Sequence, residues 1–268
     1  MSLKGKNILV TGAGSGIGKS LSLEAARRGA NLILAGRRRE ALEDTATAIA
    51  GLTNVIVVPC DLTELTGRAK LVAAIRDAGG RLSILVNNAG VLAVGSLATI
   101  TDAEAVDMVA TNILAPILLS RDVLPFLEQE EDARIVNIGS MFGEIAYPYF
   151  AAYSATKFAL RGFSDALRRE LTGSSVSISY AAPRATRTAA AKKFAAFIEP
   201  MNMILDDPET VAGDVWDGVE QRKCNIYPGL TERIGIAIQG LCPGLLNRYL
   251  GKFNTSKDVK NADGLGLK

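Results

Sequence analysis

The stretch Thr11-Gly12-Ala13-Gly14-Ser15-Gly16-Ile17-Gly18 decides the fold. It follows the short aliphatic run Asn7–Val10 and precedes a segment, Ser20–Arg28, whose apolar residues recur at helical spacing. A strand that turns through glycines into a helix binds pyrophosphate well, because its backbone approaches the ligand closely and the helix N-terminus attracts negative charge. The sequence therefore predicts a dinucleotide-binding turn at residues 11–18.

The spacing of the glycines narrows this prediction. Gly12, Gly16 and Gly18 give T-G-x-x-x-G-x-G rather than G-x-G-x-x-G. A Walker-type loop is a weak alternative, because its first glycine would fall at Ala13. A simple chain reversal is the other alternative for such a turn taken alone. The predicted contacts to the cofactor here are Gly12, Gly14, Ser15, Gly16, Ile17 and Gly18.

Further aliphatic runs alternate with helical patterns along the chain. These runs are Asn31–Ala35, Val55–Val58, Ile84–Val86, Arg134–Ile138, Val176–Tyr180 and, more weakly, Asn225–Tyr227. The alternation predicts an α/β fold, a Rossmann-like doubly wound parallel sheet of about seven strands with helices on both faces. Because no repeat or linker interrupts the pattern, we expect residues 1–268 to form a single dinucleotide-binding catalytic domain.

The composition excludes several classes of function. The 30 basic and 28 acidic residues leave a net charge of +2, and no basic stripe points to nucleic acid. The chain has no histidine and 3 scattered cysteines, which argues against Ser-His-Asp hydrolysis, a disulfide framework and a metal site. The N-terminus lacks the apolar region of a signal peptide, and the apolar stretch Ile234–Leu246 is shorter than the ~20 residues of a membrane span. We expect a cytoplasmic protein.

Tyr153 and Lys157 form a Y-x-x-x-K pair in the helical segment Ala151–Arg169, and Ser140 follows the fifth predicted strand. The spacing of the pair places both side chains on one helix face. A hydride transfer to a carbonyl needs a proton for the developing alkoxide. Tyr153 can supply it, and a nearby ammonium would lower the pKa of its phenol. Ser140 can hydrogen-bond the substrate oxygen.

Together these motifs resemble the short-chain dehydrogenase/reductase family. The resemblance adds Asn112, in the helical stretch Thr101–Leu119, as a fourth catalytic residue that supports a water chain from Lys157. It implies that Asp61, with Leu62, contacts the adenine of the cofactor, although Asp61 alone could equally be a helix N-cap. It also implies that Asn88, Ala89 and Gly90, in an N-N-A-G motif, close the pocket for the adenosine of the cofactor. Further expected cofactor contacts are Tyr153, Lys157, Pro183, Thr186 and Thr188.

The second predicted strand ends at Gly36-Arg37-Arg38. NAD enzymes carry an acid there, which binds the ribose hydroxyls and would repel a 2′-phosphate. Arginine pairs with a phosphate, so the sequence favours NADP over NAD, with Arg37 and Arg38 as contacts. The alternative is that these residues are a solvated start of the next helix.

Two segments depart from the family pattern. Arg184 replaces a glycine after Pro183, where it could face the substrate. Residues 184–207 are expected to form a substrate lid, whose apolar face indicates a fairly hydrophobic substrate. Residues 230–268 form a variable C-terminal extension, in which Thr231–Leu250 predicts one or two amphipathic helices and the chain from Lys252 is expected to fray. For this extension, pocket cover or subunit contact is favoured over a membrane, because its polar face lacks a strong cluster of basic residues.

The sequence thus predicts an NADP(H)-dependent oxidoreductase that acts on a small-molecule carbonyl or alcohol, with Tyr153 as general acid or base. Two alternatives stay open: an epimerase or dehydratase that uses the same site, and an NADP-binding regulatory or scaffold protein without turnover. The family resemblance implies a homodimer or homotetramer that pairs through the helices carrying Asn112 and Tyr153.

Overall fold

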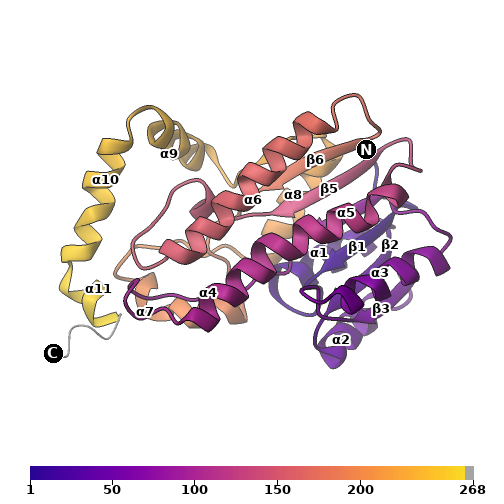
Figure 1. Cartoon of the computed structure of the whole chain (residues 1–268), viewed down its shortest axis with the longest axis horizontal. Coiled ribbons are helices and arrows are strands. Elements are labelled where there is room, and N and C mark those ends of the chain that lie inside the picture. The colour runs from indigo at the N-terminus through magenta and orange to yellow at the C-terminus, as the bar shows by residue number, and fades with distance from the viewer. Residues whose placement is uncertain (263–268) are drawn as a thin grey trace.

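A computed structural model shows a central sheet with helices packed on both of its faces (Figure 1). The structure describes residues 1–262. The strands are β1 (Asn7–Thr11), β2 (Asn31–Gly36), β3 (Val55–Pro59), β4 (Ile84–Asn87), β5 (Ala133–Ile138), β6 (Val176–Ala181) and β7 (Asn225–Ile226). All of them lie within about two residues of the predicted runs, because buried parallel strands appear in a sequence as short continuous apolar stretches.

The seven strands are parallel and follow the order β3-β2-β1-β4-β5-β6-β7. The order reverses at β1, which pairs with β2 on one side and with β4 on the other. Ligands bind outside the carboxyl ends of the strands at such a reversal. The predicted Rossmann-like fold is confirmed, and the glycine turn lies at the place where the topology opens a crevice.

The helices are α1 (Gly16–Arg27), α2 (Arg39–Ile49), α3 (Leu65–Asp77), α4 (Asp102–Val109), α5 (Ala115–Leu127), α6 (Ala151–Glu170) and α8 (Pro208–Glu220). Successive residues of β1 serve two different cores, since side chains alternate along a strand. Ile8 packs with α1, α2 and α8, whereas Leu9 packs with α3 and α5. The strand that positions the glycine turn is therefore buried on both faces.

One helical stretch of the described chain, Asp102–Leu127, is long and apolar enough to cross a bilayer by length and composition alone. It consists of α4, the π-helical turn η1 (Ala110–Leu114) and α5. About a third of its most apolar window is buried, and Leu119, Val123 and Leu127 belong to the core beneath the sheet. The stretch therefore packs as a covering helix of the sheet.

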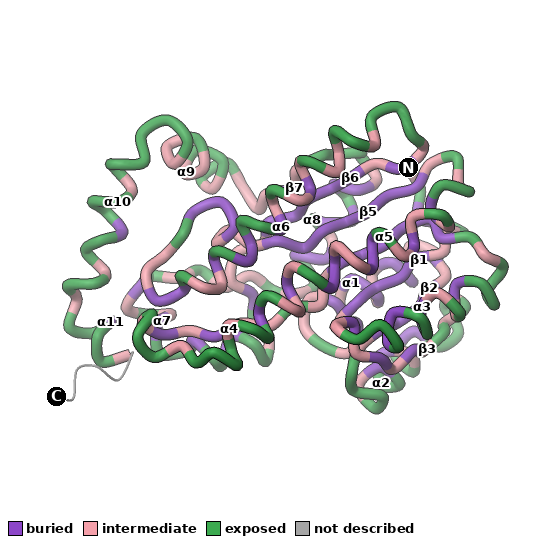
Figure 2. The backbone as a smooth tube through the Cα atoms, viewed as in Figure 1, coloured by how far each residue is buried: buried purple, intermediate pink, exposed green. Residues whose placement is uncertain are grey.

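After β6 the chain forms a short helical segment and, later, an outlying helical arm. The first consists of η3 (Ala189–Phe194) and α7 (Ala195–Ile198). The arm consists of α9 (Leu230–Leu241), α10 (Pro243–Gly251), η4 (Lys252–Thr255) and α11 (Lys257–Ala262). Most of α9 and α10 is exposed or only half-buried (Figure 2). The expected break near Pro243 is confirmed, but the expectation of fraying from Lys252 is wrong as far as Ala262, because Val259 is fully buried; residues 263–268 lie outside the described chain.

Candidate active site

The glycine turn between β1 and α1 is shaped by two left-handed residues and one close approach. Gly12 and Gly16 have φ of +66° and +53°, where a side chain would be strained. A Cβ at Gly18 would overlap the carbonyl oxygen of Gly12 and the side-chain amide of Asn88. That amide donates a hydrogen bond of 2.8 Å to the carbonyl of Thr11, so Asn88 fixes the turn from the end of β4. The backbone at the N-terminus of α1 is consequently not covered by side chains of the turn.

A cavity of about 360 Å³ lies over this turn. Nearly all of the predicted cofactor contacts line it: Gly12, Gly14, Ser15, Gly16, Ile17, Gly18, Arg37, Arg38, Asp61, Leu62, Asn88, Ala89, Gly90, Tyr153, Lys157 and Thr188. Pro183 and Thr186 are not among its lining residues. The carbonyl of Pro183 accepts a hydrogen bond from Met141, and Thr186 is buried, with its hydroxyl donating to the carbonyl of Arg184. These two residues therefore lie behind the walls of the cavity and do not face it.

Two guanidinium groups mark one end of the cavity. Arg37 and Arg38 line it, are exposed, and make no ion pair within residues 1–262. Asp61 lies nearby, and its carboxylate accepts hydrogen bonds from the amide and the hydroxyl of Thr63 at 2.9 and 2.7 Å. Burial opposes its ionisation, but these hydrogen bonds and the charge on Arg37 lower the pKa of Asp61. Asp61 is not the N-cap of α3, a position taken by Glu64.

Tyr153 and Lys157 reach the other end of the same cavity from α6. The Nζ of Lys157 lies 5.7 Å from the centre of the Tyr153 ring and donates a hydrogen bond of 3.1 Å to the carbonyl of Ile138. Burial raises the pKa of Tyr153 to about 12, against a lowering effect from a hydrogen bond with Ser140. Burial also lowers the pKa of Lys157 to about 8. The sequence predicts a lowered pKa for Tyr153; this is wrong for the structure, because burial outweighs the hydrogen bond with Ser140.

Ser140 begins the tight turn η2 (Met141–Gly143) that follows β5. Its hydroxyl oxygen accepts a hydrogen bond of 3.1 Å from the amide of Phe142, and this fixes the side chain at the turn. Gly139 and Gly143 lie directly against the Tyr180 ring, where a Cβ would overlap its atoms. The turn can therefore hold Ser140 beside Tyr153 only while both of these positions remain glycine.

Asn112 lies in η1, and its side chain is buried. Its amide oxygen accepts a hydrogen bond from the amide of Val91, and its Nδ2 donates to the carbonyl of Val91 and to the hydroxyl of Thr156. A π-helical turn re-aims one side chain out of the regular helical pattern, and such turns often occur at functional sites. Asn112 thereby connects the chain after β4 to α6, the helix that carries Tyr153 and Lys157. Thr156, which the sequence analysis missed, is its partner there.

A match to a known family agrees with this arrangement. Residues 6–198 match the family described as short chain dehydrogenase. The chain belongs to this family. Among curated proteins it is similar to a ketoacyl reductase, HetN, of Nostoc sp., with 34% identity over 182 residues. That alignment spans 68% of this chain and 63% of the relative, so it covers less than two thirds of the relative's own length.

Solved structures of short-chain dehydrogenases have the same fold. One from Burkholderia phymatum, in complex with NAD, has a TM-score of 0.83 at 25% identity, covering 92% of this chain and 96% of that one. A short-chain dehydrogenase from Sphingobium yanoikuyae, in complex with NADPH, has a TM-score of 0.76 at 27% identity, covering 90% and 95%. Structures this similar thus hold either nicotinamide cofactor.

This short-chain dehydrogenase carries an arginine where the sequence analysis expected the family's glycine. Arg184 makes hydrogen bonds of 3.0 Å to both carboxylate oxygens of Asp206 and one of 2.7 Å to Glu232. The alternative in which Arg184 faces the substrate is therefore not observed. Arg184 instead connects the loop after β6 to residue 206 and to the first turn of α9.

Aromatic and aliphatic side chains surround the tyrosine end of the cavity in this short-chain dehydrogenase. Phe142 packs edge-on to Tyr153, with ring centres 6.2 Å apart, and also contacts Tyr147 and Phe150. Phe150 in turn contacts Phe194 of η3. Leu92 lines the cavity beside them. The surroundings of the Tyr153 ring on this side are consequently apolar.

Proposed function

We propose that this chain is an NADP(H)-dependent oxidoreductase that reduces the carbonyl group of a fairly hydrophobic small molecule. The observation that carries the proposal is a single cavity, which extends from the glycine turn and two unpaired arginines to Tyr153 and Lys157. A dinucleotide fits the glycine turn, since Gly12, Gly14 and Gly16 line the cavity with backbone that carries no side chain. When bound, the nicotinamide supplies the hydride for the carbonyl carbon.

The chain's own residues would supply the proton and the polar contacts. With a pKa of about 12, the phenol of Tyr153 is protonated at neutral pH, which suits a donor to the alkoxide that forms during reduction. Ser140 would hydrogen-bond the same oxygen. Lys157, on the same helix face as Tyr153, would hold the ribose next to the nicotinamide. Asn112 would position the adjoining loop through Val91.

Preference for NADP is supported by Arg37 and Arg38, because each offers a planar set of donors to a 2′-phosphate and neither is neutralised by an acid within the described chain. The NADPH complex of the similar Sphingobium protein agrees with this choice, although the NAD complex of the Burkholderia protein makes a direct comparison necessary.

Residues 184–207 would act as a substrate lid. Ala189 and Ala190 line the cavity, and Lys193 reaches across to donate a hydrogen bond of 3.1 Å to the carbonyl of Leu92. The two ends of the segment are joined where Arg187 donates to the carbonyl of Asp206 at 2.9 Å. Phe194 and Phe197 of this segment are buried against Phe150, so the segment forms a closed cover over the tyrosine end of the cavity.

We also propose a homodimer that pairs through α4, η1 and α6. These elements lie side by side, and they expose Val106, Val109, Leu114 and Phe158. Exposed apolar groups of this kind mark association surfaces. Sedimentation of a Val109→Glu, Phe158→Glu variant tests this, since a dimer that persisted would exclude this face. A cytoplasmic location is supported by the three cysteines, all of them free.

The decisive experiment follows NADPH and NADH oxidation by the full chain with ketones, aldehydes, quinones, steroids and acyl thioesters. We expect turnover of at least one apolar carbonyl compound, faster with NADPH, and a loss of about 10²- to 10⁴-fold in Tyr153→Phe, which keeps the ring but not the proton. NADPH binding without turnover on the whole panel would favour a regulatory or scaffold protein. Repeated turnover without net NADPH consumption would favour an epimerase or dehydratase.

A further inference from the structure

The C-terminal arm, residues 230–262, leaves the body of the protein after β7 (Figure 1). It first forms α9, which has no buried residue, and then α10, in which only Leu250 is buried. One side of α9 faces the body, because a Cβ at Gly235 would contact Ile145 at 3.2 Å. The opposite side of the arm is free to meet something else.

The exposed surface of the arm carries an apolar stripe, which we define as Leu230, Ile234, Leu241, Leu245 and Tyr249. These side chains are 76%, 61%, 82%, 63% and 59% exposed, respectively. Spacings of four and seven residues put the three members in α9 on one face of the helix. The two members in α10 continue the pattern at four-residue spacing past Pro243. Scattered apolar residues are ordinary on a surface, but a contiguous row of large ones marks a contact site.

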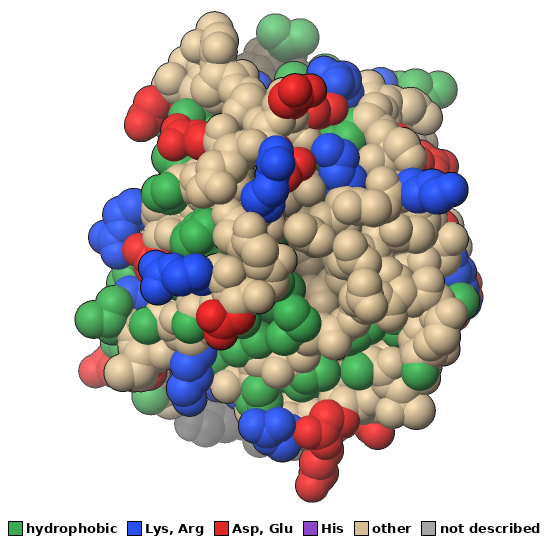
Figure 3. All heavy atoms as spheres, turned by 90° about the vertical axis from the view of Figure 1, so that its right-hand side faces the viewer, with side chains coloured by type: hydrophobic (Ala, Val, Ile, Leu, Met, Phe, Trp, Pro, Cys, Tyr) green, Lys and Arg blue, Asp and Glu red, His purple; other side chains and the backbone are tan. Residues whose placement is uncertain are grey.

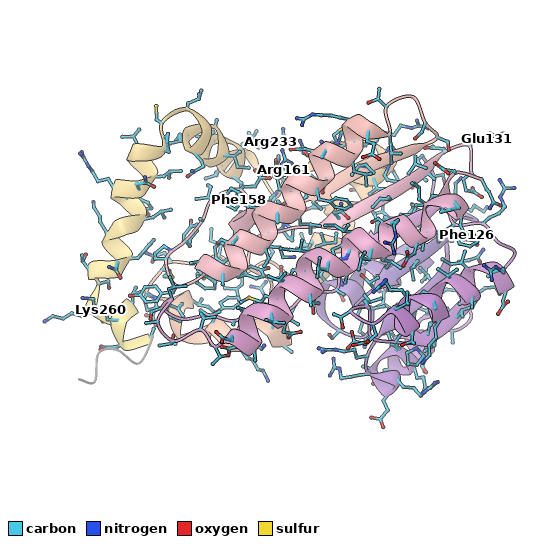
Figure 4. The ribbon with its side chains drawn as sticks, in the orientation of Figure 1. Phe126, Glu131, Phe158, Arg161, Arg233 and Lys260 are labelled. Atoms are coloured by element: carbon cyan, nitrogen blue, oxygen red, sulfur yellow. The ribbon has the colours of Figure 1, made fainter. Side chains whose placement is uncertain are left out.

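The arm is also basic. Within residues 230–262 the basic side chains are Arg233, Arg248, Lys252, Lys257 and Lys260, and the acidic ones are Glu232 and Asp258. The carboxylate of Glu232 forms an ion pair with the guanidinium of Arg184, with a nitrogen–oxygen distance of 2.7 Å. No ion pair within the described chain neutralises any of the five basic groups. Figure 4 labels Arg233 near the start of the arm and Lys260 near its end, where the lysine points away from the body.

This excess of positive charge belongs to the arm and not to the surface as a whole. On the face that lies to the right in Figure 1, basic and acidic side chains are mixed (Figure 3). The net charge of the whole chain is only +2. An apolar stripe flanked by unpaired basic groups is the composition of a helix that lies in the plane of a lipid surface, with apolar groups below the headgroups and cations among them.

We propose that the C-terminal arm docks on an anionic lipid bilayer. A second copy of the chain is the less favourable occupant, because a symmetric contact through the stripe would bring two sets of unpaired basic groups together. An anionic bilayer instead complements the charge and accepts the apolar side chains. The sequence alone disfavours a membrane contact, because the polar face lacks a strong cluster of basic residues. In the described structure, however, these basic groups have no ion-pair partners, whereas Glu232 is paired with Arg184.

Docking would place the substrate side of the active site at the lipid surface. Phe253 of the arm lies 6.1 Å from Tyr249 of the stripe and 6.4 Å from Tyr147, ring centre to centre. Tyr147 contacts Phe142, which packs on Tyr153. α11 also lies against α7 of the proposed lid. An apolar carbonyl compound dissolved in the bilayer would thus have a short route to the site; this consequence rests on the proposed function, whereas the docking itself does not.

The test is flotation of the full chain with vesicles of phosphatidylcholine alone and with vesicles that also contain phosphatidylglycerol. We expect binding to the anionic vesicles only, weakening as salt is added. Leu241→Ser with Leu245→Ser should weaken it roughly tenfold or more, because two large side chains no longer enter the lipid. Arg248→Gln and Lys252→Gln should each weaken it about fivefold. Leu52→Ser, which changes another exposed leucine between α2 and β3, should leave binding intact.

Three results would overturn the proposal: equal binding to neutral and anionic vesicles, unchanged binding by both the serine and the glutamine variants, or no vesicle binding at all. In the last case, a serine variant that sediments as a smaller species than the parent would identify a second copy as the occupant. NADPH binding, measured for every variant, shows that the domain is folded. Vesicle binding by a chain that turns over no carbonyl compound would refute the proposed function and leave the docking standing.

Discussion

The side-chain amide of Asn112 donates a hydrogen bond of 3.0 Å to the hydroxyl of Thr156, 44 residues further along the chain. The hydroxyl of Thr156 in turn donates a hydrogen bond of 2.8 Å to the carbonyl of Tyr153, one turn earlier on the same helix. Thr156 thereby links the π-helical turn to the residue proposed as proton donor. Both Asn112 and Thr156 are buried, so neither group can exchange its partner for bulk water.

Thr156→Val should therefore impair catalysis while the domain stays folded. The substitution keeps the shape but leaves one of the two N–H groups of the Asn112 amide without an acceptor, since the other still donates to the carbonyl of Val91. We expect a cost of about 1–3 kcal/mol in the free energy of unfolding. A small displacement of Tyr153 should lower kcat by roughly tenfold or more. Thr156→Ser retains the hydroxyl and serves as the matched control. Urea denaturation and NADPH oxidation measure the two effects; a Val variant as active as the Ser variant would contradict the proposed linkage.

The two arginines that follow β2 give a second prediction. Arg37→Ala with Arg38→Ala should raise the KM for NADPH by roughly 10- to 100-fold, because charge-assisted hydrogen bonds to the 2′-phosphate are lost. The KM for NADH should change little, since NADH lacks this phosphate. Arg39→Ala is the control, because Arg39 pairs with Glu43 at 3.4 Å and does not line the cavity. Parallel changes for both cofactors in the double variant would refute the assignment of NADP.

The parts of this protein that could be predicted from sequence are those fixed by local patterns. Each strand is a short apolar run, and the Gly12–Gly18 turn needs no distant residue to reveal it, because only glycine permits its backbone. Tyr153 and Lys157 are adjacent on one helix face, so their shared location also follows from spacing.

The rest depends on contacts between distant segments. Arg184 meets Asp206 and Glu232, which are 22 and 48 residues away, and no local pattern indicates that they are partners. The pKa of Tyr153 depends on burial, which outweighs the hydrogen bond with Ser140, and burial of a side chain is a property of the whole fold. The excess of basic residues in the arm can be read from the sequence, but the pairing of Glu232 with Arg184, 48 residues away, cannot.

Arg184 supplies a third prediction, this one on stability. Arg184→Ala leaves the partly buried carboxylates of Asp206 and Glu232 without their shared partner, and it should lower the free energy of unfolding by about 1–2 kcal/mol, since partial exposure screens the charges. Thermal unfolding measures the change. Arg187→Ala removes an exposed pair with Asp207 and should lower the melting temperature less. If the two variants melted at the same temperature, the contacts of Arg184 would stabilise the protein no more than the exposed Arg187–Asp207 pair does.

Lys157 predicts how stability depends on pH. Burial lowers the pKa of its ammonium from 10.5 to about 8 in the folded chain, so between these values the unfolded chain binds more protons than the folded one. The free energy of unfolding must then rise with pH through this window, because the cost of a buried charge, which is full below pH 8, disappears as the folded group loses its proton. Lys157→Met carries no such charge. The parent should therefore gain up to about 3 kcal/mol relative to this variant as the pH rises from 8 to 10.5.

Urea denaturation of the parent, Lys157→Met and Lys4→Met at a series of pH values across this window checks the prediction. Lys4 is exposed, so its variant should follow the parent at every pH. If instead the curves of the parent and of Lys157→Met ran parallel, the ammonium would titrate alike in the folded and unfolded chains. Lys157 would then be hydrated in the folded protein, and its hydrogen bond to the carbonyl of Ile138 would not represent the resting state of the site.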